Sequence, residues 1–256
     1  MVDIHGHILP GVDDGPESMV ESLGLLHQAE KEGITDIVVT PHAYHPQYNV
    51  RKDLVIEKYN NVKEELAKLD LQINLHLGQE IRIGDSIVEQ IKEGKALTLA
   101  NSKYVLLELP SSNVPNYTIA IIQELLGLGK VPVIAHPERN KAIAEKPSRL
   151  LKLITHGAIS QITAGSLAGH FGKSIQKTSM QLIDCNLIHT YGSDVHSRKT
   201  RPFLFDAGLC YLEKHKKQDT VDIFLENNAR IIENKEVIIL EPIEPPSSKK
   251  WWSFIG

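Results

Sequence analysis

Cysteine is scarce in this 256-residue chain, which contains only Cys185 and Cys210. The two are far apart in the sequence, so neither a Cys-x-x-Cys metal motif nor a framework of several disulfides is available. The sequence therefore predicts neither a thiolate zinc site nor a small secreted scaffold. A reducing, cytoplasmic location is the simplest expectation for such a chain.

Long apolar runs and an excess of basic residues are also missing. No stretch approaches the length of a membrane span, and the first residues lack the basic and apolar regions of a signal peptide. The formal net charge of −4 argues against a nucleic-acid partner held by a broad basic face. With 41% hydrophobic and 23% charged residues, the composition is that of an ordinary soluble globular protein, and we expect neither a transmembrane segment nor bound nucleic acid.

Apolar runs bounded by turn residues alternate with amphipathic helical patterns along most of the chain. The expected strands are 2–5, 36–40, 73–77, 104–109, 131–135, 159–163 and 188–191. The expected helices are 17–32, 54–69, 87–92, 118–128, 148–155, 165–184, 203–212 and 220–228. This alternation implies parallel strands joined by right-handed crossovers. Because composition does not change before residue 240, we expect residues 1–240 to form one closed or nearly closed α/β barrel.

Residues 241–256 differ from the rest of the chain. They are rich in Pro, Ser and Lys and contain both tryptophans, Trp251 and Trp252. Such a segment cannot bury much apolar surface, so the composition predicts a flexible tail. Two interpretations stay open: an end that contacts nothing in particular, or a weak anchor for a membrane surface or a membrane-bound partner.

Histidines and carboxylates stand at the ends of the expected strands. His5 and His7 are two positions apart on an extended chain, so their side chains point to one face, and Asp194 and His196 repeat this spacing. In parallel barrels the carboxyl ends of the strands carry the active site. The candidates at these ends are His5, His7, His42, Glu80, Glu108, His136, Asp194 and His196, with Asp14 on the loop after the first strand.

This set of side chains predicts a metal centre. Imidazoles and carboxylates without thiolates suit Mn²⁺, Fe or Zn²⁺. The candidates outnumber the ligands of one ion, so we expect a cluster of two or three divalent ions. Clustered ions favour phosphoester hydrolysis, because they generate hydroxide near neutral pH and neutralise the attacking and leaving oxygens. Any one of these residues alone would more simply be a capping, ion-pairing or surface residue, but that interpretation does not explain all of them together.

Several motifs occur here in the order and spacing of a known superfamily. They are Asp3-Ile4-His5-Gly6-His7 continuing to Asp13-Asp14-Gly15, Thr40-Pro41-His42, Glu80, Glu108, His136-Pro137-Glu138-Arg139, Ile162-Thr163-Ala164-Gly165-Ser166-Leu167, and Gly192-Ser193-Asp194-Val195-His196 followed by Thr200-Arg201-Pro202. The set resembles the PHP (polymerase and histidinol phosphatase) superfamily. Within it, residues 1–235 most resemble the bacterial manganese-dependent protein-tyrosine phosphatases of capsule and exopolysaccharide operons.

The resemblance implies a fold and a set of roles. The fold would be a distorted (β/α)₇ TIM-like barrel, the PHP fold, with three metal ions, of which Mn²⁺ is the expected kind. Arg139 and Arg201 match the phosphate-binding arginines of the family, and guanidinium groups suit phosphoryl oxygens. One departure is Gly6, which is often Cys in relatives but is not a ligand position. By family position, His5, His7, Glu80, Glu108 and Asp194 would serve the first two ions with Glu80 bridging, His136 would bind the second, and Asp14, His42 and His196 would bind the third.

The implied activity is metal-dependent hydrolysis of phosphotyrosine, with the tyrosine-rich tail of a bacterial tyrosine kinase that regulates capsule or exopolysaccharide synthesis as the expected partner. Neither cysteine has an arginine at the spacing that cysteine-dependent phosphatases require, so no phosphocysteine intermediate is expected. Three alternatives remain: a small-molecule phosphatase acting on a compound such as histidinol phosphate, a PHP nuclease, and an inactive scaffold. The acidic balance counts against the nuclease, and the complete ligand set counts against the scaffold. His45 and His170 could line the substrate entrance, but the sequence assigns them no role.

Overall fold

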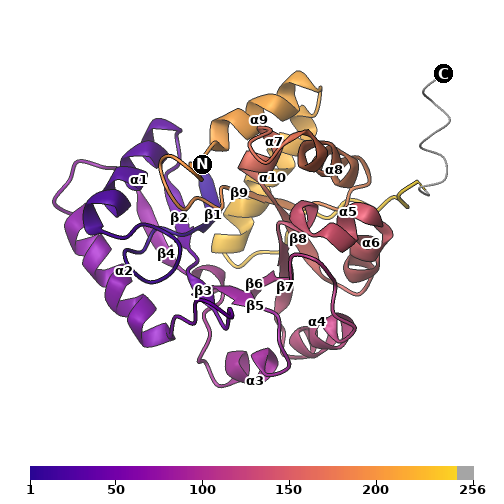
Figure 1. Ribbon diagram of the computed structural model, residues 1–256, viewed down its shortest axis with the longest axis horizontal. Helices are drawn as coiled ribbons and strands as arrows, with labels where there is room; N and C mark the ends of the chain where they lie inside the picture. The colour runs from indigo at the N-terminus through magenta and orange to yellow at the C-terminus, as the bar shows by residue number, and fades with distance from the viewer. Residues whose placement is uncertain (247–256) are drawn as a thin grey trace.

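The computed structural model describes residues 1–246 and has parallel strands at its centre with helices around them (Figure 1). All of the strand pairs in these residues are parallel, in the orders β1-β2-β4 and β3-β5-β6-β7-β8-β9. The strands are β1 (Val2–Gly6), β2 (Asp36–Val39), β3 (His42–Ala43), β4 (Asn74–Leu77), β5 (Glu80–Arg82), β6 (Tyr104–Glu108), β7 (Val131–Ala135), β8 (Ile159–Thr163) and β9 (Thr190–Gly192).

The two sheets form one ring of strands. β2 and β3 are halves of one extended segment, and so are β4 and β5, so counting each pair once leaves seven strands. A parallel bridge between Gly6 and Val195 joins the first strand to the chain just after the last one. The backbone N–H of Asp194 donates to the carbonyl of His5 over 2.8 Å at this junction. The predicted distorted (β/α)₇ barrel is therefore confirmed.

Helices cover the outside of the ring, as Figure 1 shows. Their apolar residues recur at helical spacing, as in α6, which buries Leu150, Leu153 and Ile154. The helices are α1 (Met19–Lys31), α2 (Lys52–Leu66), α3 (Ile87–Lys92), α4 (Thr118–Gly127), α5 (Lys141–Glu145), α6 (Ser148–Thr155), α7 (Ala164–Leu167), α8 (Lys173–Asp184), α9 (Phe205–Lys214) and α10 (Gln218–Ile232), with 3₁₀ turns η1 (Leu99–Asn101) and η2 (Pro137–Arg139).

One predicted helix is wrong. The expected continuous helix over 165–184 is two helices, α7 and α8, separated by a turn at residues 168–172. Gly169 and Gly172 in this turn have φ values of +82° and +92°, which a right-handed helix cannot contain. The sequence has helical apolar periodicity on both sides of the turn, and this periodicity alone predicts one continuous helix.

Alternation along the strands divides the core in two. In β6, Val105 and Leu107 belong to the large cluster that includes the helices, whereas Leu106 lies in a smaller cluster built mainly from strand residues. Ile231 of α10 joins this smaller cluster. Successive side chains of a strand thus point alternately into the barrel interior and outward toward the helices. The polar candidates are left at the carboxyl ends of the strands.

The beginning of the expected tail contacts the barrel. Ile243 N–H donates to the carbonyl of Cys185 over 2.8 Å, and the carbonyl of Glu241 accepts from the Asn186 side chain over 2.9 Å. The expected role of Trp251 and Trp252 concerns residues 247–256, which lie outside the described range. None of the helices in residues 1–246 is long and apolar enough to span a membrane.

The contact of α9 with the barrel gives a stability test at Gly208. A Cβ atom there would clash with Tyr191 Oη and would lie 3.0 Å from the Ala164 carbonyl oxygen. We expect Gly208→Ala to lower the free energy of unfolding by about 1–3 kcal/mol, the usual cost of overpacking. Gly127→Ala is the control, because nothing lies within 4 Å of its Cβ position. Urea unfolding followed by circular dichroism measures both, and equal midpoints for the two variants would contradict this tight contact.

Candidate metal centre

His5 and His7 at the end of β1 point into one buried space. Their Nε2 atoms are 3.4 Å apart. The other ring nitrogen of each is held by a neighbour, since His5 Nδ1 lies 2.9 Å from Gln161 Oε1 and His7 Nδ1 lies 2.7 Å from Asp13 Oδ2. An acceptor at Nδ1 places the proton there and leaves the Nε2 lone pair available to a metal.

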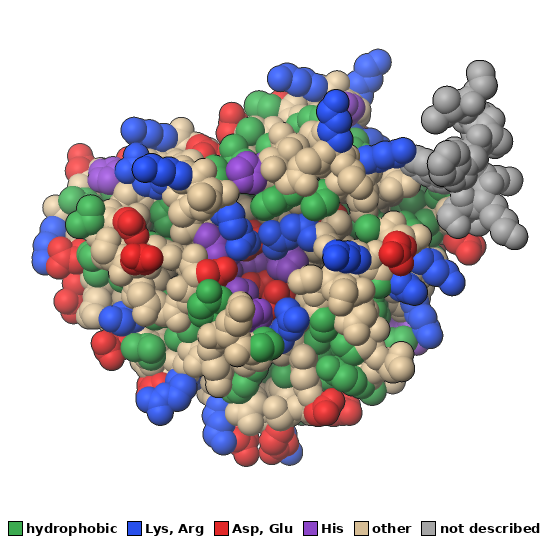
Figure 2. All heavy atoms as spheres, in the orientation of Figure 1, with side chains coloured by type: hydrophobic (Ala, Val, Ile, Leu, Met, Phe, Trp, Pro, Cys, Tyr) green, Lys and Arg blue, Asp and Glu red, His purple; other side chains and the backbone are tan. Residues whose placement is uncertain are grey.

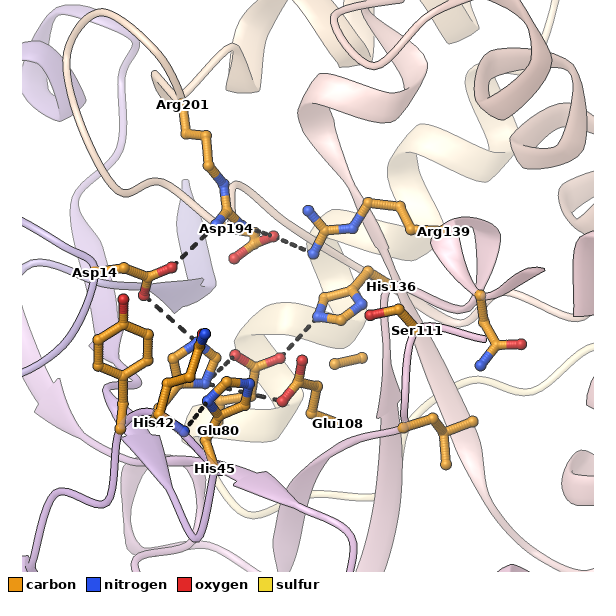
Figure 3. Close-up of a pocket in the computed structure, with 15 residues that line it drawn as sticks. Asp14, His42, His45, Glu80, Glu108, Ser111, His136, Arg139, Asp194 and Arg201 are labelled. Atoms are coloured by element: carbon orange, nitrogen blue, oxygen red, sulfur yellow. Dashed lines mark hydrogen bonds and ion pairs between the residues drawn. The ribbon is translucent and has the colours of Figure 1, made fainter. Parts of the chain in front are cut away.

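Glu80 at the start of β5 lies at the centre of the histidines, and its side chain is buried. Oε2 of Glu80 is 3.4 Å from His5 Nε2, 3.2 Å from His7 Nε2 and 3.1 Å from His42 Nδ1. Oε1 is 2.8 Å from His136 Nε2. Figure 3 shows Glu80 between His42 and His136, with Glu108 beside it. One carboxylate therefore connects four histidines from three other strands.

Asp194 joins the histidines to two arginines. Its Oδ1 lies 3.4 Å from His5 Nε2, and its Oδ2 accepts from Arg201 Nη2 over 2.6 Å and also from Arg139 Nη2. In Figure 3 the two guanidinium groups approach from different loops and meet at this carboxylate. Two guanidinium groups beside a cluster of acids and imidazoles are suited to binding an oxyanion.

A third part of the cluster lies nearer to solvent. Asp14 Oδ1 is 3.2 Å from His196 Nε2 and 3.5 Å from His42 Nε2. The rings of His7 and His196 are stacked with centroids 3.9 Å apart. The carboxylate of Asp14 is about one-third exposed, whereas the two histidines beside it are nearly buried.

The structure brings all of the predicted site residues together. Three groups have ligand atoms within 4.8 Å of one another: His5, His7, Glu80 and Asp194; His42, Glu80 and Glu108; and His7, Asp14, His42 and His196. His136 contacts the cluster through Glu80, and Arg139 and Arg201 contact it through Asp194.

Several polar atoms of the cluster fit a bound cation. Glu108 Oε2, Asp194 Oδ1, His42 Nδ1 and His196 Nε2 are buried and, among the described residues, make no hydrogen bond of adequate geometry, although acids or imidazoles lie nearby. Burying an unsatisfied polar atom is costly. Divalent ions inside the cluster would satisfy these atoms, and oxygen and imidazole donors without sulfur suit Mn²⁺, Fe or Zn²⁺.

Electrostatics hold Asp194 and His42 in forms that bind metals. Burial opposes the charge of Asp194, but Arg139 and then Arg201 outweigh it and hold the pKa of this carboxyl well below its usual range. Burial, followed by the charge of His7, lowers the pKa of His42 to about 4. A carboxylate and a neutral imidazole are the protonation states that ligation requires. Burial opposes the charge of His7, but the acids Asp13 and Glu80 outweigh it and raise the pKa of His7 to about 10, so this ring must release a proton when an ion binds.

Two ligand-bearing turns have unusual backbone conformations. His136 has a φ of 34° and Asp194 a φ of 54°, both in the left-handed region that non-glycine residues seldom occupy. Each leads from a strand end into the site, and such conformations persist only where neighbouring contacts hold them. Glu138 supplies one of these contacts, because its buried Oε1 accepts from Ser166 Oγ over 2.6 Å and from Thr163 N–H over 3.2 Å.

Sequence reasoning missed the residues that orient the ligands. Neither Asp13 nor Gln161 belongs to a sequence pattern that is typical of metal ligands. Only the fold shows that Asp13 holds His7 and that Gln161 holds His5. The position of Asp13 next to Asp14 was the one available indication. Glu138 now explains why the His136–Arg139 motif and the 162–167 motif occur together.

A cavity of about 330 Å³ opens from the cluster to the surface. Histidine and acidic side chains gather in this hollow in Figure 2, with basic side chains beside them. Beyond the candidate ligands and arginines, its lining includes His45, Tyr48, Leu109, Ser111 and Asn140. A small charged group can therefore reach the cluster while the rest of its molecule extends outward.

Comparisons with known proteins agree with this arrangement. The model of the family described as "Capsular polysaccharide synthesis, CpsB/CapC" matches residues 1–233. CapC of Staphylococcus aureus is 42% identical over 255 residues, with all of both chains covered. The tyrosine-protein phosphatase YwqE of Bacillus subtilis is 38% identical over 254 residues, covering 99% of this chain and all of YwqE.

Solved structures lead to the same group. A structure from a study of YwqE of Bacillus subtilis and CpsB of Streptococcus pneumoniae, described as metal-dependent tyrosine phosphatases, superposes with a TM-score of 0.93 at 38% identity, covering 95% of this chain and 99% of that one. An amidohydrolase from Mycoplasma synoviae has a TM-score of 0.58 at 12% identity, with 96% of this chain and 90% of that one covered, which shows the fold alone.

Asp13 provides a test of the cluster that does not require turnover. We expect Asp13→Asn to weaken Mn²⁺ binding by about 10–100-fold, because His7 loses the anion that holds and polarises its ring. Titration calorimetry on metal-stripped protein measures this. Asp36→Asn is the matched control, since Asp36 pairs with His76 over 3.0 Å away from the cluster. Equal affinities in the two variants would contradict an orienting role for Asp13.

Proposed function

Because this chain belongs to the CpsB/CapC capsular polysaccharide synthesis family, we propose that it is a metal-dependent phosphatase that hydrolyses phosphotyrosine in proteins. The observation that carries the proposal is the meeting of Arg139 and Arg201 at Asp194, at the edge of a buried cluster of histidines and carboxylates. Such a site can bind a phosphoryl group through its oxygens while leaving its substituent in the open cavity.

The proposed ligands follow the three groups of the cluster. Glu80 belongs to two of these groups and would contribute to holding two ions, and the group nearer to solvent would hold a third. Mn²⁺ is the ion proposed for all three, because the donor set suits it and the chain resembles manganese enzymes. The ligands of the first two ions are His5, His7, Glu80, Glu108, His136 and Asp194, and those of the third are Asp14, His42 and His196.

The chain's own residues prepare the site for a phosphoryl group. When bound, clustered divalent ions lower the pKa of water and neutralise phosphoryl charge. The guanidinium of Arg139 lies over the ring of Phe171, 5.2 Å from its centroid, and the backbone of Arg201 is held by His196 N–H, which donates to its carbonyl over 2.9 Å. Both arginines are therefore positioned before substrate arrives, and they stabilise the negative charge that spreads over the equatorial oxygens.

The leaving group needs little help. Tyrosine has a pKa near 10, so a phenolate departs without a strong general acid. Neither cysteine lines the cavity, and burial raises the pKa of Cys185 above its usual value, which disfavours a thiolate nucleophile there. The reaction is therefore a direct transfer of the phosphoryl group to water.

We extend the proposal to the setting of the reaction. Residues 1–240 act as one catalytic domain, the location is cytoplasmic, and the substrate is the tail of a bacterial tyrosine kinase that regulates capsule or exopolysaccharide synthesis. The family description, which refers to capsular polysaccharide synthesis, and the tyrosine-protein phosphatase names of the relatives support this setting.

Hydrolysis of a phosphotyrosine peptide tests the proposal. With Mn²⁺ present we expect turnover, and we expect Arg139→Ala and Arg201→Ala each to lower kcat/KM by about 10²–10³-fold, the usual effect of removing a donor to transition-state charge. EDTA should abolish turnover, and added Mn²⁺ should restore it. Arg198→Ala is the matched control, because Arg198 lies against Gly24 outside the cavity. Turnover of histidinol phosphate without turnover of the peptide would favour the small-molecule alternative.

The cysteines give an independent test of mechanism. We expect the double variant Cys185→Ala, Cys210→Ala to keep kcat within about twofold of the wild type, because a direct transfer to water involves no thiolate. Circular dichroism establishes that the variant is folded. Loss of turnover in a folded, Mn²⁺-loaded double variant would refute direct hydrolysis and require a covalent intermediate.

A further inference from the structure

Two aromatic side chains line the cavity beside the metal cluster. His45 and Tyr48 come from the loop 44–51 between β3 and α2, and both contribute to the cavity lining. Their rings are nearly parallel, with centroids 5.6 Å apart and an interplanar angle of 19°. Both also lie nearly parallel to His42, with centroid distances of 4.7 Å for His45 and 5.8 Å for Tyr48. We call His45 and Tyr48 the aromatic wall.

The aromatic wall is not part of the metal cluster. Neither residue belongs to any of the three ligand groups found among the described residues. Nδ1 of His45 accepts the Gln47 N–H over 3.2 Å, so a neutral ring carries its proton on Nε2. A side chain with its Nδ1 lone pair engaged by its own loop serves better as a surface for a ligand than as a further ligand to an ion.

Both ends of the wall's loop are fixed. At the start, Tyr44 has a φ of 58°, and its hydroxyl donates to Gln90 Oε1 of α3 over 3.0 Å. At the end, Val50 N–H donates to the His42 carbonyl over 3.2 Å, and the Val50 carbonyl accepts from Gln79 Nε2 over 2.8 Å. The wall is therefore preorganised, so little ordering is required when a ligand binds.

The position of the arginines fixes the direction of a substrate. In Figure 3, Arg139 and Arg201 approach from one side of the cavity and His45 lies on the opposite side, with Glu80 and Glu108 between them. A phosphate held by the arginines and the cluster leaves its substituent in this cavity, where the aromatic wall and Leu109 are part of the lining. A flat ring can stack on the parallel faces of the wall, and an alkyl chain cannot.

We propose that His45 and Tyr48 form the binding site for the phenyl ring of an aryl phosphate, and that this wall selects aryl over alkyl phosphates. The identity of the phosphoryl-transfer site rests on the proposed function, but recognition of the ring does not require turnover. The wall acts on substrate choice, whereas the arginines and the cluster act on the phosphoryl group, whatever its substituent.

Binding of two phosphonates separates these contributions. Phenylphosphonate and methylphosphonate cannot be hydrolysed, and they differ in the ring alone. For the Mn²⁺-loaded wild type we expect phenylphosphonate to bind about tenfold more tightly, as an aromatic contact of ordinary strength would give. Tyr48→Ala should weaken the binding of phenylphosphonate by about fivefold to tenfold and leave the binding of methylphosphonate unchanged. Tyr48→Phe keeps the ring, so its affinity for phenylphosphonate should stay within about twofold of the wild type.

The controls address folding and position. His45→Ala and Tyr48→Leu repeat the test if Tyr48→Ala is unstable, and Mn²⁺ content and thermal unfolding verify each variant. Tyr117→Ala is the matched control, because this tyrosine is exposed before α4 and does not line the cavity. Equal binding of the two phosphonates by the wild type, or equal weakening of both in the wall variants, would overturn the proposal.

The outcome is distinguishable from failure of the proposed function. If the wild type prefers phenylphosphonate but hydrolyses no phosphotyrosine peptide, the ring site stands and the proposed reaction is wrong. If peptide turnover occurs without a preference for phenylphosphonate, the reaction stands and the aromatic wall has no part in selecting substrates.

Discussion

The burial of one carboxylate among four imidazoles is the constraint on which the structure depends. Glu80 has almost no contact with solvent, and His5 and His136 are among the rings that surround it. A buried charge without partners would be strongly destabilising, and removing one member of such a set leaves the others uncompensated. The partners come from three different strands, so they meet because the strands form a ring. The barrel thus brings together charged side chains that no single strand or helix could place in contact.

The rest of the architecture follows from keeping this set in place. The smaller core cluster fills the barrel interior with apolar side chains and includes Ile231 of α10, while the candidate ligands gather at one end of the ring. At that end the backbone itself departs from ordinary geometry, at His136 and Asp194. Contacts such as the hydrogen bonds that Glu138 accepts from the last residue of β8 and from α7 hold these turns, and the cost of the strained conformations is offset by the packing of the whole barrel.

Features that depend on local sequence could be predicted, whereas features that depend on contacts between residues far apart in the sequence could not. The strands and the clustering of the candidate ligands could be predicted, because period-two spacing and position at a strand end are local properties, as with His5 and His7. The break after α7 depends on the φ values of Gly169 and Gly172, which apolar periodicity does not report. The orienting role of Gln161 depends on its placement beside His5, 156 residues away in sequence, and no local pattern encodes such a pairing.

In the proposed function, the site separates binding of the phosphoryl group from recognition of the molecule that carries it. The proposed roles of the cluster and the two arginines depend on charge and oxygen geometry, which a phosphotyrosine, an alkyl phosphate and histidinol phosphate share. These features therefore cannot by themselves distinguish the phosphatase alternatives that the sequence left open. The distinction must come from the loops that line the outer part of the cavity, and the loop 44–51 is the one that brings aromatic faces to it. If the aromatic wall selects the substituent, then converting such a barrel from one phosphoester to another calls for changes in this loop and none in the proposed ligands, because function depends on the site more than on the fold.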